Sequence, residues 1–289
     1  MHPRLVDTKV NTMEAVLAQK RRIRSPVGAG MFYPEDKKEM LRYIRSFGLQ
    51  EGRGGYAQAI IAPHGAWGFS GTLAANAFSS AMGRSGSVNS VVILGPIHDK
   101  REKGLFLSNS HSFNTPLGNI QVDQEITEEL EFSGDYFEIN DIPHLWEHSI
   151  EILLPFVKYC FPQALIVPIL LGQPNEVYIK DLARALKKVI TPVLNETLLV
   201  VSCNLSCDDD TATARGLAYE CLRLFSEKNA PALASAIFDG KVNPCGGALV
   251  VSLLESGLLD ESVCSTSDNM LSAVGIENDT VFYSAVSFG

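Results

Sequence analysis

Long hydrophobic runs are absent from this sequence of 289 residues, and their absence excludes one class of protein. No stretch approaches the ~20 consecutive apolar residues that a membrane-spanning helix needs. The start of the chain does not read as a signal peptide, because its basic cluster follows a weakly apolar stretch instead of preceding it. We therefore expect a cytoplasmic protein without membrane contacts.

Positive charge is also scarce, since 24 Lys and Arg residues stand against 33 Asp and Glu residues. A net charge of -9 offers no electrostatic attraction to nucleic acid or to an anionic membrane. The local basic cluster at residues 20–24 reads as a solvated segment that leads into the fold. The expected partner is therefore a small molecule or a metal ion, and not a nucleic acid.

The sequence has no CxxC pair, no internal repeat and no low-complexity segment. Its six cysteines are expected to be reduced, because disulfides are rare in large chains without an export signal. Cys203 and Cys207 have a spacing found in metal sites, but a single pair is a weak signal. The ordinary globular composition predicts one core, so we expect an N-terminal extension over residues 1–22 and one domain over 23–289.

Short, continuously apolar runs predict strands that are buried on both faces of a largely parallel sheet. These runs lie at residues 57–62, 90–94, 164–171 and 197–202. Stretches with helical character alternate with them, at residues 72–82, 150–159, 177–190, 212–225 and 231–238. This alternation predicts an α/β fold, in which ligands bind beyond the carboxyl ends of the strands.

Two histidines follow two predicted strands in a similar arrangement. His64 follows Pro63 in PHGAWGFSG, where three glycines are expected to let the backbone turn, and His98 follows Gly95-Pro96. If these strands are near neighbours the imidazoles converge, and neutral imidazole is a ligand for Fe, Cu, Zn and Ni. Each histidine alone has an ordinary alternative, which is a hydrogen bond to a loop carbonyl for His64 and solvation for His98.

Cys245 is a third candidate ligand, in the segment NPCGG. The two glycines after it allow close approach of the backbone, and a thiolate there would complete a site of two histidines and one cysteine. Taken alone, Cys245 is more simply interpreted as a small buried hydrophobic residue.

The segment HLWEH, residues 144–148, supports a different hypothesis. It matches the H-x-x-E-H pattern of inverted zinc proteases, in which His144 and His148 would share one helix face with Glu147 as the base. The alternative is a polar helix start, because Pro143 suits a first turn and Glu147 suits the dipole at that end.

Together these segments resemble the Memo family, also called AmmeMemoRadiSam system protein B, from about residue 24 to the C-terminus. The resemblance is carried in order by RSPVGAGMFYPED, PHGAWGFSG, LGPIHDKREKGLFLS, NTPLGNIQVD, HLWEHSIEILLPF, VVSCNLSC and CGG. It implies a single-domain αβα sandwich like that of the class III extradiol dioxygenases.

The resemblance also implies a site and partners. It implies metal ligands at His64, His98 and Cys245, with iron or copper as the metal and redox or oxygen chemistry as the activity. It places HLWEH at a structural helix start that lines the pocket, and it implies radical SAM and AMMECR-type proteins as partners. The residues it assigns to the pocket are Trp67, His144, Glu147 and His148.

Two departures from the family pattern affect the chemistry. Asn204 stands where the family has Asp, and Cys207 stands where it has His, so these two are the candidate catalytic residues. A cysteine handles protons differently from histidine, because its ordinary pKa is about 8.5 against about 6.5. Trp67, Phe69 and Leu153 replace more polar family residues. Two hypotheses follow: a metal-dependent oxidoreductase, or a non-catalytic binding or scaffold protein that has lost the Asp and His.

Overall fold

The computed structural model describes residues 22–49, 54–267, 270–274 and 279–289. In this part of the chain, an eight-stranded sheet has the order β11-β14-β2-β9-β3-β8-β4-β7. In that order its strands are Cys264–Thr266, Val286–Phe288, Ala59–Ala62, Thr197–Ser202, Ser90–Pro96, Leu165–Leu171, Leu105–Leu107 and Phe137–Ile139. The central strands β2, β9, β3 and β8 are parallel, and antiparallel pairing begins at β14 on one side and at β4 on the other. The carboxyl ends of the central strands therefore lie at one edge.

Both faces of the sheet are covered, as the continuously apolar strands predict. Along β3, Val92 and Leu94 belong to one hydrophobic cluster, while Val91 and Ile93 belong to the cluster on the opposite face. Successive side chains of a strand point to opposite faces, so an apolar run without alternation requires a core on each side. The structure is therefore an αβα sandwich with a single domain, which confirms the expected fold class.

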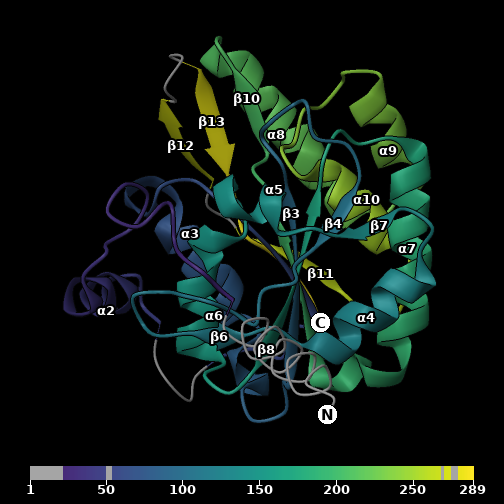
Figure 1. Ribbon diagram of the computed structural model, residues 1–289. Helices are drawn as coiled ribbons and strands as arrows, with labels where there is room; N and C mark the ends of the chain where they lie inside the picture. The colour runs from purple at the N-terminus through teal and green to yellow at the C-terminus, as the bar shows by residue number, and fades with distance from the viewer. Residues whose placement is uncertain (1–21, 50–53, 268–269, 275–278) are drawn as a thin grey trace, which may run out of the picture.

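The helices form the two outer layers of this sandwich (Figure 1). On one face lie α4, α7, α8, α9 and α10, which are Gln124–Ser133, Glu176–Ile190, Thr211–Ser226, Ala230–Phe238 and Gly247–Glu255. On the other face lie α2, α3 and α6, which are Lys37–Ser46, Trp67–Ser79 and Leu154–Cys160. The short α5, Asp141–Trp146, contacts β4 near the end of the sheet.

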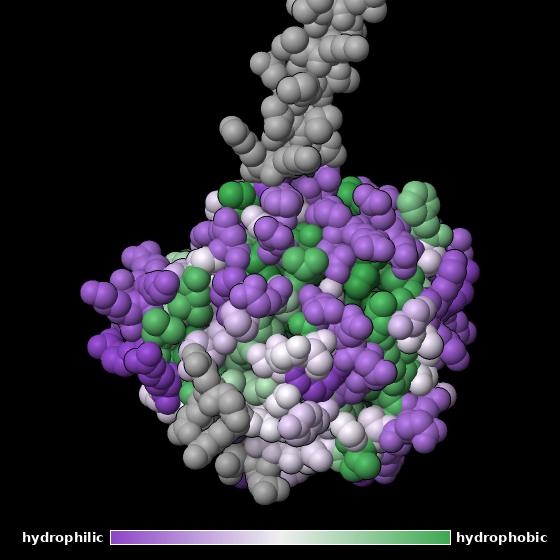
Figure 2. Space-filling view, turned by 90° about the horizontal axis from the view of Figure 1, so that it is seen from below, coloured by the Kyte–Doolittle hydropathy of each residue, from purple (hydrophilic) through white to green (hydrophobic). Residues whose placement is uncertain are grey.

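Two small sheets and three short 3-10 helices complete the described elements. One sheet has the order β1-β5-β6, with strands Ile23–Arg24, Ser112–Phe113 and Ile120–Gln121. The other has the order β10-β13-β12, with strands Ser206–Asp208, Thr280–Tyr283 and Leu271–Val274. The 3-10 helices are η1, η2 and η3, at Met82–Arg84, Glu151–Leu153 and Thr191–Glu196. Figure 1 shows β10, β12 and β13 at the top, while Figure 2 views the opposite end, where hydrophilic residues separate patches of hydrophobic ones.

The predicted strands and helices are all present, most with bounds within two residues of those expected, and two helices differ more. The helix predicted from residue 72 begins at Trp67, because Gly68 and Gly71 are helical residues and not turn residues. Gly71 instead permits a close contact, since a methyl group there would lie 2.5 Å from the ring of Phe47. The helix predicted over 150–159 is divided between η2 and α6, with a proline in the first turn of α6.

A buried ion pair connects the start of the described chain to η2. The Arg24 guanidinium contacts the Glu151 carboxylate, and both side chains are only 1% exposed. Arg24 also donates to the carbonyl oxygens of His144 and Glu147, at 2.8 Å each. Glu151 accepts further hydrogen bonds from the Gly28 amide and the Tyr33 hydroxyl. This network satisfies both buried charges and positions residues 144–151 against the sheet.

Within the described residues, no helix has both the length and the apolar character needed to cross a bilayer. All six cysteines are free, as expected. The cytoplasmic location stays a prediction, and the proposed extension over residues 1–22 lies outside the described residues except for Arg22.

The ion pair predicts a large stability difference between two glutamate variants. Glu151→Ala leaves the Arg24 charge buried without its partner, so we expect the free energy of unfolding to fall by about 3–5 kcal/mol. Glu176→Ala breaks the exposed pair with Lys180 and should change the free energy of unfolding far less, because water already solvates both charges. Urea unfolding of both variants measures the difference, and equal losses would contradict this account.

Candidate metal centre

His64 and His98 meet at the carboxyl ends of three adjacent strands, β2, β9 and β3. His64 follows β2 and His98 follows β3, and β9 lies between these strands, with Ser202 as its last residue. The strands of the two histidines are therefore not direct neighbours. Their side chains reach over the end of β9, so that the ring centroids are 5.3 Å apart and nearly perpendicular. The convergence expected from the sequence occurs across a third strand.

The protonation of the His64 ring follows from its hydrogen bonds. The Ser202 hydroxyl donates to the Ser149 carbonyl at 2.8 Å and so has only lone pairs left for His64 Nδ1, also at 2.8 Å. Nδ1 therefore carries the hydrogen and Nε2 carries a lone pair. Burial, followed by the charges of His98 and His148, lowers the pKa of His64 well below its usual value. His64 is a neutral imidazole, which is the form that binds metals.

Glu147 orients the second imidazole. Its Oε1 lies 3.0 Å from His98 Nδ1, and its Oε2 accepts from the backbone amide of His98 at 2.7 Å. Burial alone would lower the pKa of His98, but hydrogen bonds with Cys245 and Glu147 outweigh it and raise this pKa to about 10. Burial would likewise raise the pKa of Glu147, yet His98 brings it down to about 2. With Nδ1 directed at the carboxylate, His98 presents Nε2 to the centre.

Cys245 completes the group from a loop at the start of α10. Its backbone pairs with that of Asn204, since the backbone amide of Asn204 donates to the Cys245 carbonyl at 3.0 Å. Gly246 has a φ of +101°, and a Cβ at this position would lie 2.3 Å from the Ser202 carbonyl oxygen, so glycine is required there. This loop brings Cys245 Sγ to 3.5 Å from His98 Nε2.

The three side chains fit a single metal ion. One ligand atom from each of His64, His98 and Cys245 lies within 4.8 Å of the others. His64 Nε2 is buried and has no hydrogen-bond partner, although an unpaired buried polar atom is costly. A cation bound by this group would replace the hydrogen bond between His98 Nε2 and Cys245 Sγ. Two imidazoles and one thiolate suit iron, copper or zinc.

A second group of potential ligands, made of His98, Glu147 and His148, is less suited to a metal. The Glu147 carboxylate already accepts hydrogen bonds from three backbone amides, those of His98, His148 and Ser149, at 2.7 Å each. These donors cannot leave without unfolding the loop. His148 stacks between His98 and Phe32, with centroid distances of 4.7 and 4.6 Å. In this arrangement Glu147 and His148 position the His98 ring.

Asn204 and Cys207, the candidate catalytic residues, have different surroundings. Asn204 Oδ1 accepts from the backbone amide of His64 at 3.0 Å, so Asn204 contacts two members of the centre. Cys207 is exposed, and its Sγ lies 3.6 Å from a carboxylate oxygen of Asp279. Burial and Asp279 raise the pKa of Cys207 to about 11, so it stays a neutral thiol at neutral pH.

The zinc protease hypothesis does not fit the described structure. Helix α5 ends at Trp146, so His148 is not one helical turn beyond His144. His144 is buried, its Nε2 faces the Phe106 carbonyl at 3.2 Å, and burial lowers its pKa to about 4. The two imidazoles therefore do not share one helix face.

Trp67 is also buried, 2% exposed, and donates its indole N–H to the Ile152 carbonyl at 3.1 Å. Leu153 belongs to the same core cluster, while Phe69 is 55% exposed. The pocket role given to Trp67 and His144 stays a prediction.

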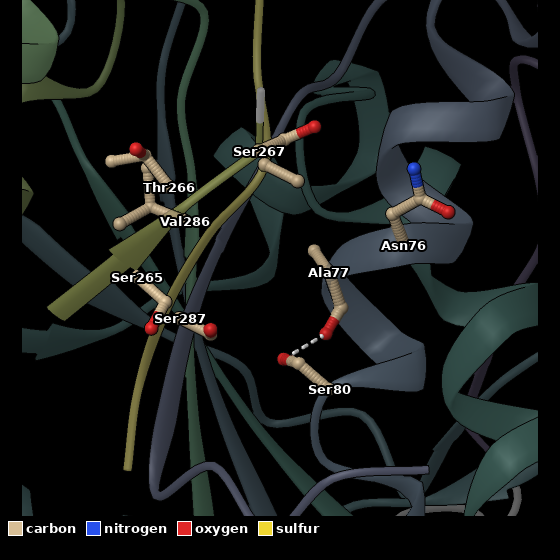
Figure 3. Close-up of a pocket in the computed structure, with 9 residues that line it drawn as sticks. Asn76, Ala77, Ser80, Ser265, Thr266, Ser267, Val286 and Ser287 are labelled. Carbon is tan, nitrogen blue, oxygen red and sulfur yellow. Dashed lines mark hydrogen bonds between the residues drawn. The ribbon is translucent and has the colours of Figure 1, made fainter. Parts of the chain in front are cut away.

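A separate hollow lies between α3 and the sheet edge formed by β11 and β14 (Figure 3). Hydroxyl and amide side chains line much of it, and Ser80 donates to the Ala77 carbonyl at 2.6 Å. Its described lining contains no imidazole, thiol or carboxylate side chain, so it offers no second set of metal ligands of those types.

Sequence reasoning named Glu147 and His148 as pocket residues but missed three other residues that hold the imidazoles: Ser202, Ser149 and Phe32. Ser202 ends the strand predicted over 197–202, so the same strand-end rule could have included it. Ser149 and Phe32 gave no comparable signal, because their contacts with the centre come from segments distant in the sequence.

The hydrogen bonds of His64 predict its tautomer and its resistance to protonation. In long-range ¹H–¹⁵N spectra of the metal-free protein, His64 should carry its hydrogen on Nδ1 and stay neutral at pH 6.5, where an ordinary imidazole is half protonated, because burial holds its pKa well below that value. Ser202→Ala removes the acceptor at Nδ1 and should give a mixture of tautomers. Protonation of His64 near pH 6.5 in the unmutated protein would contradict this interpretation.

Comparison with known proteins identifies the family. The family model described as "Memo-like protein" matches residues 24–261. A MEMO1 family protein of Thermotoga neapolitana is 31% identical over 81% of this chain and 88% of its own length. A MEMO1 family protein of Methanobrevibacter smithii is 32% identical over 64% of this chain and 69% of its own length. Another, of Nitrosopumilus maritimus, is 27% identical over 80% of this chain and 86% of its own length. The strand-end histidines and the glycine-flanked cysteine thus belong to a chain that is a member of the Memo family.

Proposed function

We propose that this protein binds one redox-active metal ion, iron or copper, through His64 Nε2, His98 Nε2 and Cys245 Sγ, and uses it in redox or oxygen chemistry. The observation that carries the proposal is the lone pair of His64 Nε2, which is buried without a partner and belongs to the same group of ligand atoms as His98 and Cys245. A metal ion is the partner that satisfies this nitrogen and both neighbours together.

Each residue around the ion has a distinct task in this proposal. Ser202 keeps hydrogen on His64 Nδ1, which leaves Nε2 free to bind. Glu147 directs His98 and increases the basicity of its imidazole, as carboxylates beside metal-bound histidines do. A bound iron or copper ion would supply one-electron chemistry, which none of these side chains offers.

The burial of the ligands indicates from which side a small molecule reaches the ion. His64 is 2% exposed, whereas the side chain of His98 is 40% exposed and Cys245 is half-buried. Three protein ligands leave a coordination position open, as in catalytic metal sites. The substrate therefore approaches beside His98 and Cys245.

Partner proteins of the radical SAM and AMMECR types belong to the proposal through the family resemblance. The surface of α5 supports binding of a protein in this region, because Ile142, Leu145 and Trp146 are exposed apolar residues that directly precede Glu147. Large apolar residues gathered on a surface are typical of interaction sites.

Metal titration tests the proposal directly. We expect the anaerobic protein to bind one Fe(II) or Cu(I) ion in isothermal titration calorimetry. His64→Ala removes one of three ligands and should weaken the affinity by at least about 100-fold, more than loss of an orienting residue does. Cys245→Ser should weaken the affinity for Cu(I) most, because copper(I) prefers soft ligands.

His111→Ala is the matched control, since His111 is exposed and its side chain is in neither group of potential ligands. It should bind metal like the unmutated protein. If His64→Ala binds iron and copper as tightly as His111→Ala does, the proposed centre is wrong.

A non-catalytic binding or scaffold protein is the second candidate function. It is favoured by the surroundings of Asn204 and Cys207, because Asn204 Oδ1 is occupied by the His64 amide and Cys207 stays a thiol beside Asp279. Neither residue supplies a base beside the ion.

Oxygen uptake distinguishes the two functions. With ascorbate as reductant and a chelator removing free metal, an oxidoreductase should consume oxygen faster in the loaded protein than in the apoprotein. A scaffold should bind the metal with full affinity and show equal uptake in both forms. An oxygen electrode measures the rates, and His64→Ala should abolish any metal-dependent increase.

A further inference from the structure

Asn204 has hydrogen-bond donors that no described residue uses. Its side-chain Oδ1 accepts from the backbone amide of His64, and its backbone amide donates to the Cys245 carbonyl, each at 3.0 Å. Because Oδ1 is thereby identified as the acceptor, the other terminal atom is the NH2 group, which carries two hydrogens. Asn204 is half-buried, and its contacts with His64 and Cys245 place its side chain beside two of the proposed ligands.

Tyr283 provides a second unused donor near the same place. The residue is only 5% exposed, but its hydroxyl is not among the fully buried polar atoms that lack a partner, so this oxygen reaches accessible space without a hydrogen bond to another described residue. A methyl group on Gly65 would lie 2.9 Å from this hydroxyl oxygen, so the phenol is close to the residue that follows His64. Burial, and then Cys207, raise the pKa of Tyr283, which keeps its proton at neutral pH.

The strand register agrees with this location. Cys207 in β10 pairs with Val281 in β13, and Tyr283 is two residues beyond Val281. Residues two apart in a strand share a face, so Tyr283 lies on the same side of this small sheet as Cys207. Tyr283 therefore lies on the face of this sheet that carries Cys207, and its ring reaches Gly65.

Two helix N-termini add positive potential around these donors. Helix α3 begins at Trp67, three residues after His64, and α10 begins at Gly247, two residues after Cys245. Neither helix has a side-chain cap, although the Trp67 amide donates to the Phe32 carbonyl and the Gly247 amide to the Pro244 carbonyl. The dipole of a helix N-terminus attracts anions.

Three carboxylates of this region have other partners. Glu147 is held by three backbone amides and His98, while Asp279 and Asp208 act on Cys207. None of the three forms a hydrogen bond with the side chain of Asn204 or Tyr283 in the described structure.

We infer that Asn204 and Tyr283 form a donor pair that binds the carboxylate group of a small ligand beside the metal ion. The inference rests on the proposed function and adds the chemical class of the ligand. The amide NH2 and the phenolic O–H donate to the carboxylate, and the open coordination position takes its other oxygen. The family's Asp, which accepts hydrogen bonds only, would not provide the amide donor at position 204.

Titration of formate into the Co(II)-loaded protein tests the donor pair, because the visible bands of Co(II) change when a ligand enters its coordination sphere. Tyr283→Phe removes only the hydroxyl and should weaken formate binding about tenfold, the effect of one hydrogen bond to a charged group. Asn204→Asp keeps the acceptor for the His64 amide and replaces the donor by a negative charge, so the loss should exceed tenfold. The affinity for Co(II) itself should not fall in either variant.

Tyr219→Phe is the matched control, because Tyr219 is 60% exposed on α8 and has no place in the centre. It should bind formate like the unmutated protein. Equal formate affinity in Tyr283→Phe and the control would overturn the inference. Tyr283→Phe is the decisive variant because, unlike Asn204→Asp, it changes no charge. Absence of formate binding to the loaded, unmutated protein would overturn it as well. Failure of the unmutated protein to bind Co(II) would instead refute the metal centre, and the donor pair with it.

Discussion

The geometry of the candidate centre depends on the segment of residues 147–151, whose hydrogen bonds hold both imidazoles. Glu147 binds His98, and the Ser149 carbonyl accepts from the serine that orients His64. Glu151 anchors the segment through its buried ion pair with Arg24. A displacement of this segment would therefore move both rings at once. Residues 147–151 therefore connect the strand ends that carry the histidines to β1, the first described strand of the chain.

The segment of residues 147–151 is held firmly because it is buried, and a buried charge or polar group without a partner is costly. Glu147 and Glu151 are both buried carboxylates, and each has a cationic side chain and backbone amides as partners. These contacts leave the carboxylates no freedom to act as bases. The two imidazoles are affected in opposite ways: burial keeps His64 neutral, whereas Glu147 and Cys245 keep a proton on His98. A metal ion and this proton therefore compete for one nitrogen.

The departures at positions 204 and 207 change which proton chemistry is available. Asn204 contacts the centre through its backbone and side chain, but it can only donate with the atoms that are left. Cys207 is turned toward Asp279 and is outside the group of ligand atoms. The departures from the family pattern at positions 204 and 207 therefore alter the surroundings of the proposed ion more than its ligands. This distinction separates metal binding from turnover and makes each testable without the other.

Much of the fold was readable because its central strands have unmistakable patterns. Continuously apolar runs such as those of β3 and β9 must be buried on both faces, and this requirement predicts helices on each side of a parallel sheet. Short strands such as β7 and β11 were not predicted, because three residues carry too little periodicity. The helix assigned to HLWEH was too long, since tertiary contacts of Glu147 and His148 replace the helical hydrogen bonds there.

Local sequence therefore determined the α/β class and singled out His64, His98 and Cys245, because strand ends and glycine turns are encoded by neighbouring residues. Only the tertiary structure decided that β9 separates the two histidine strands, that Ser202 contacts His64, that Glu147 contacts His98 and that Tyr283 lies against Gly65. Those contacts link residues more than 45 positions apart, as with the 49 positions between His98 and Glu147. Their geometry depends on strand order and side-chain packing, which no local pattern specifies.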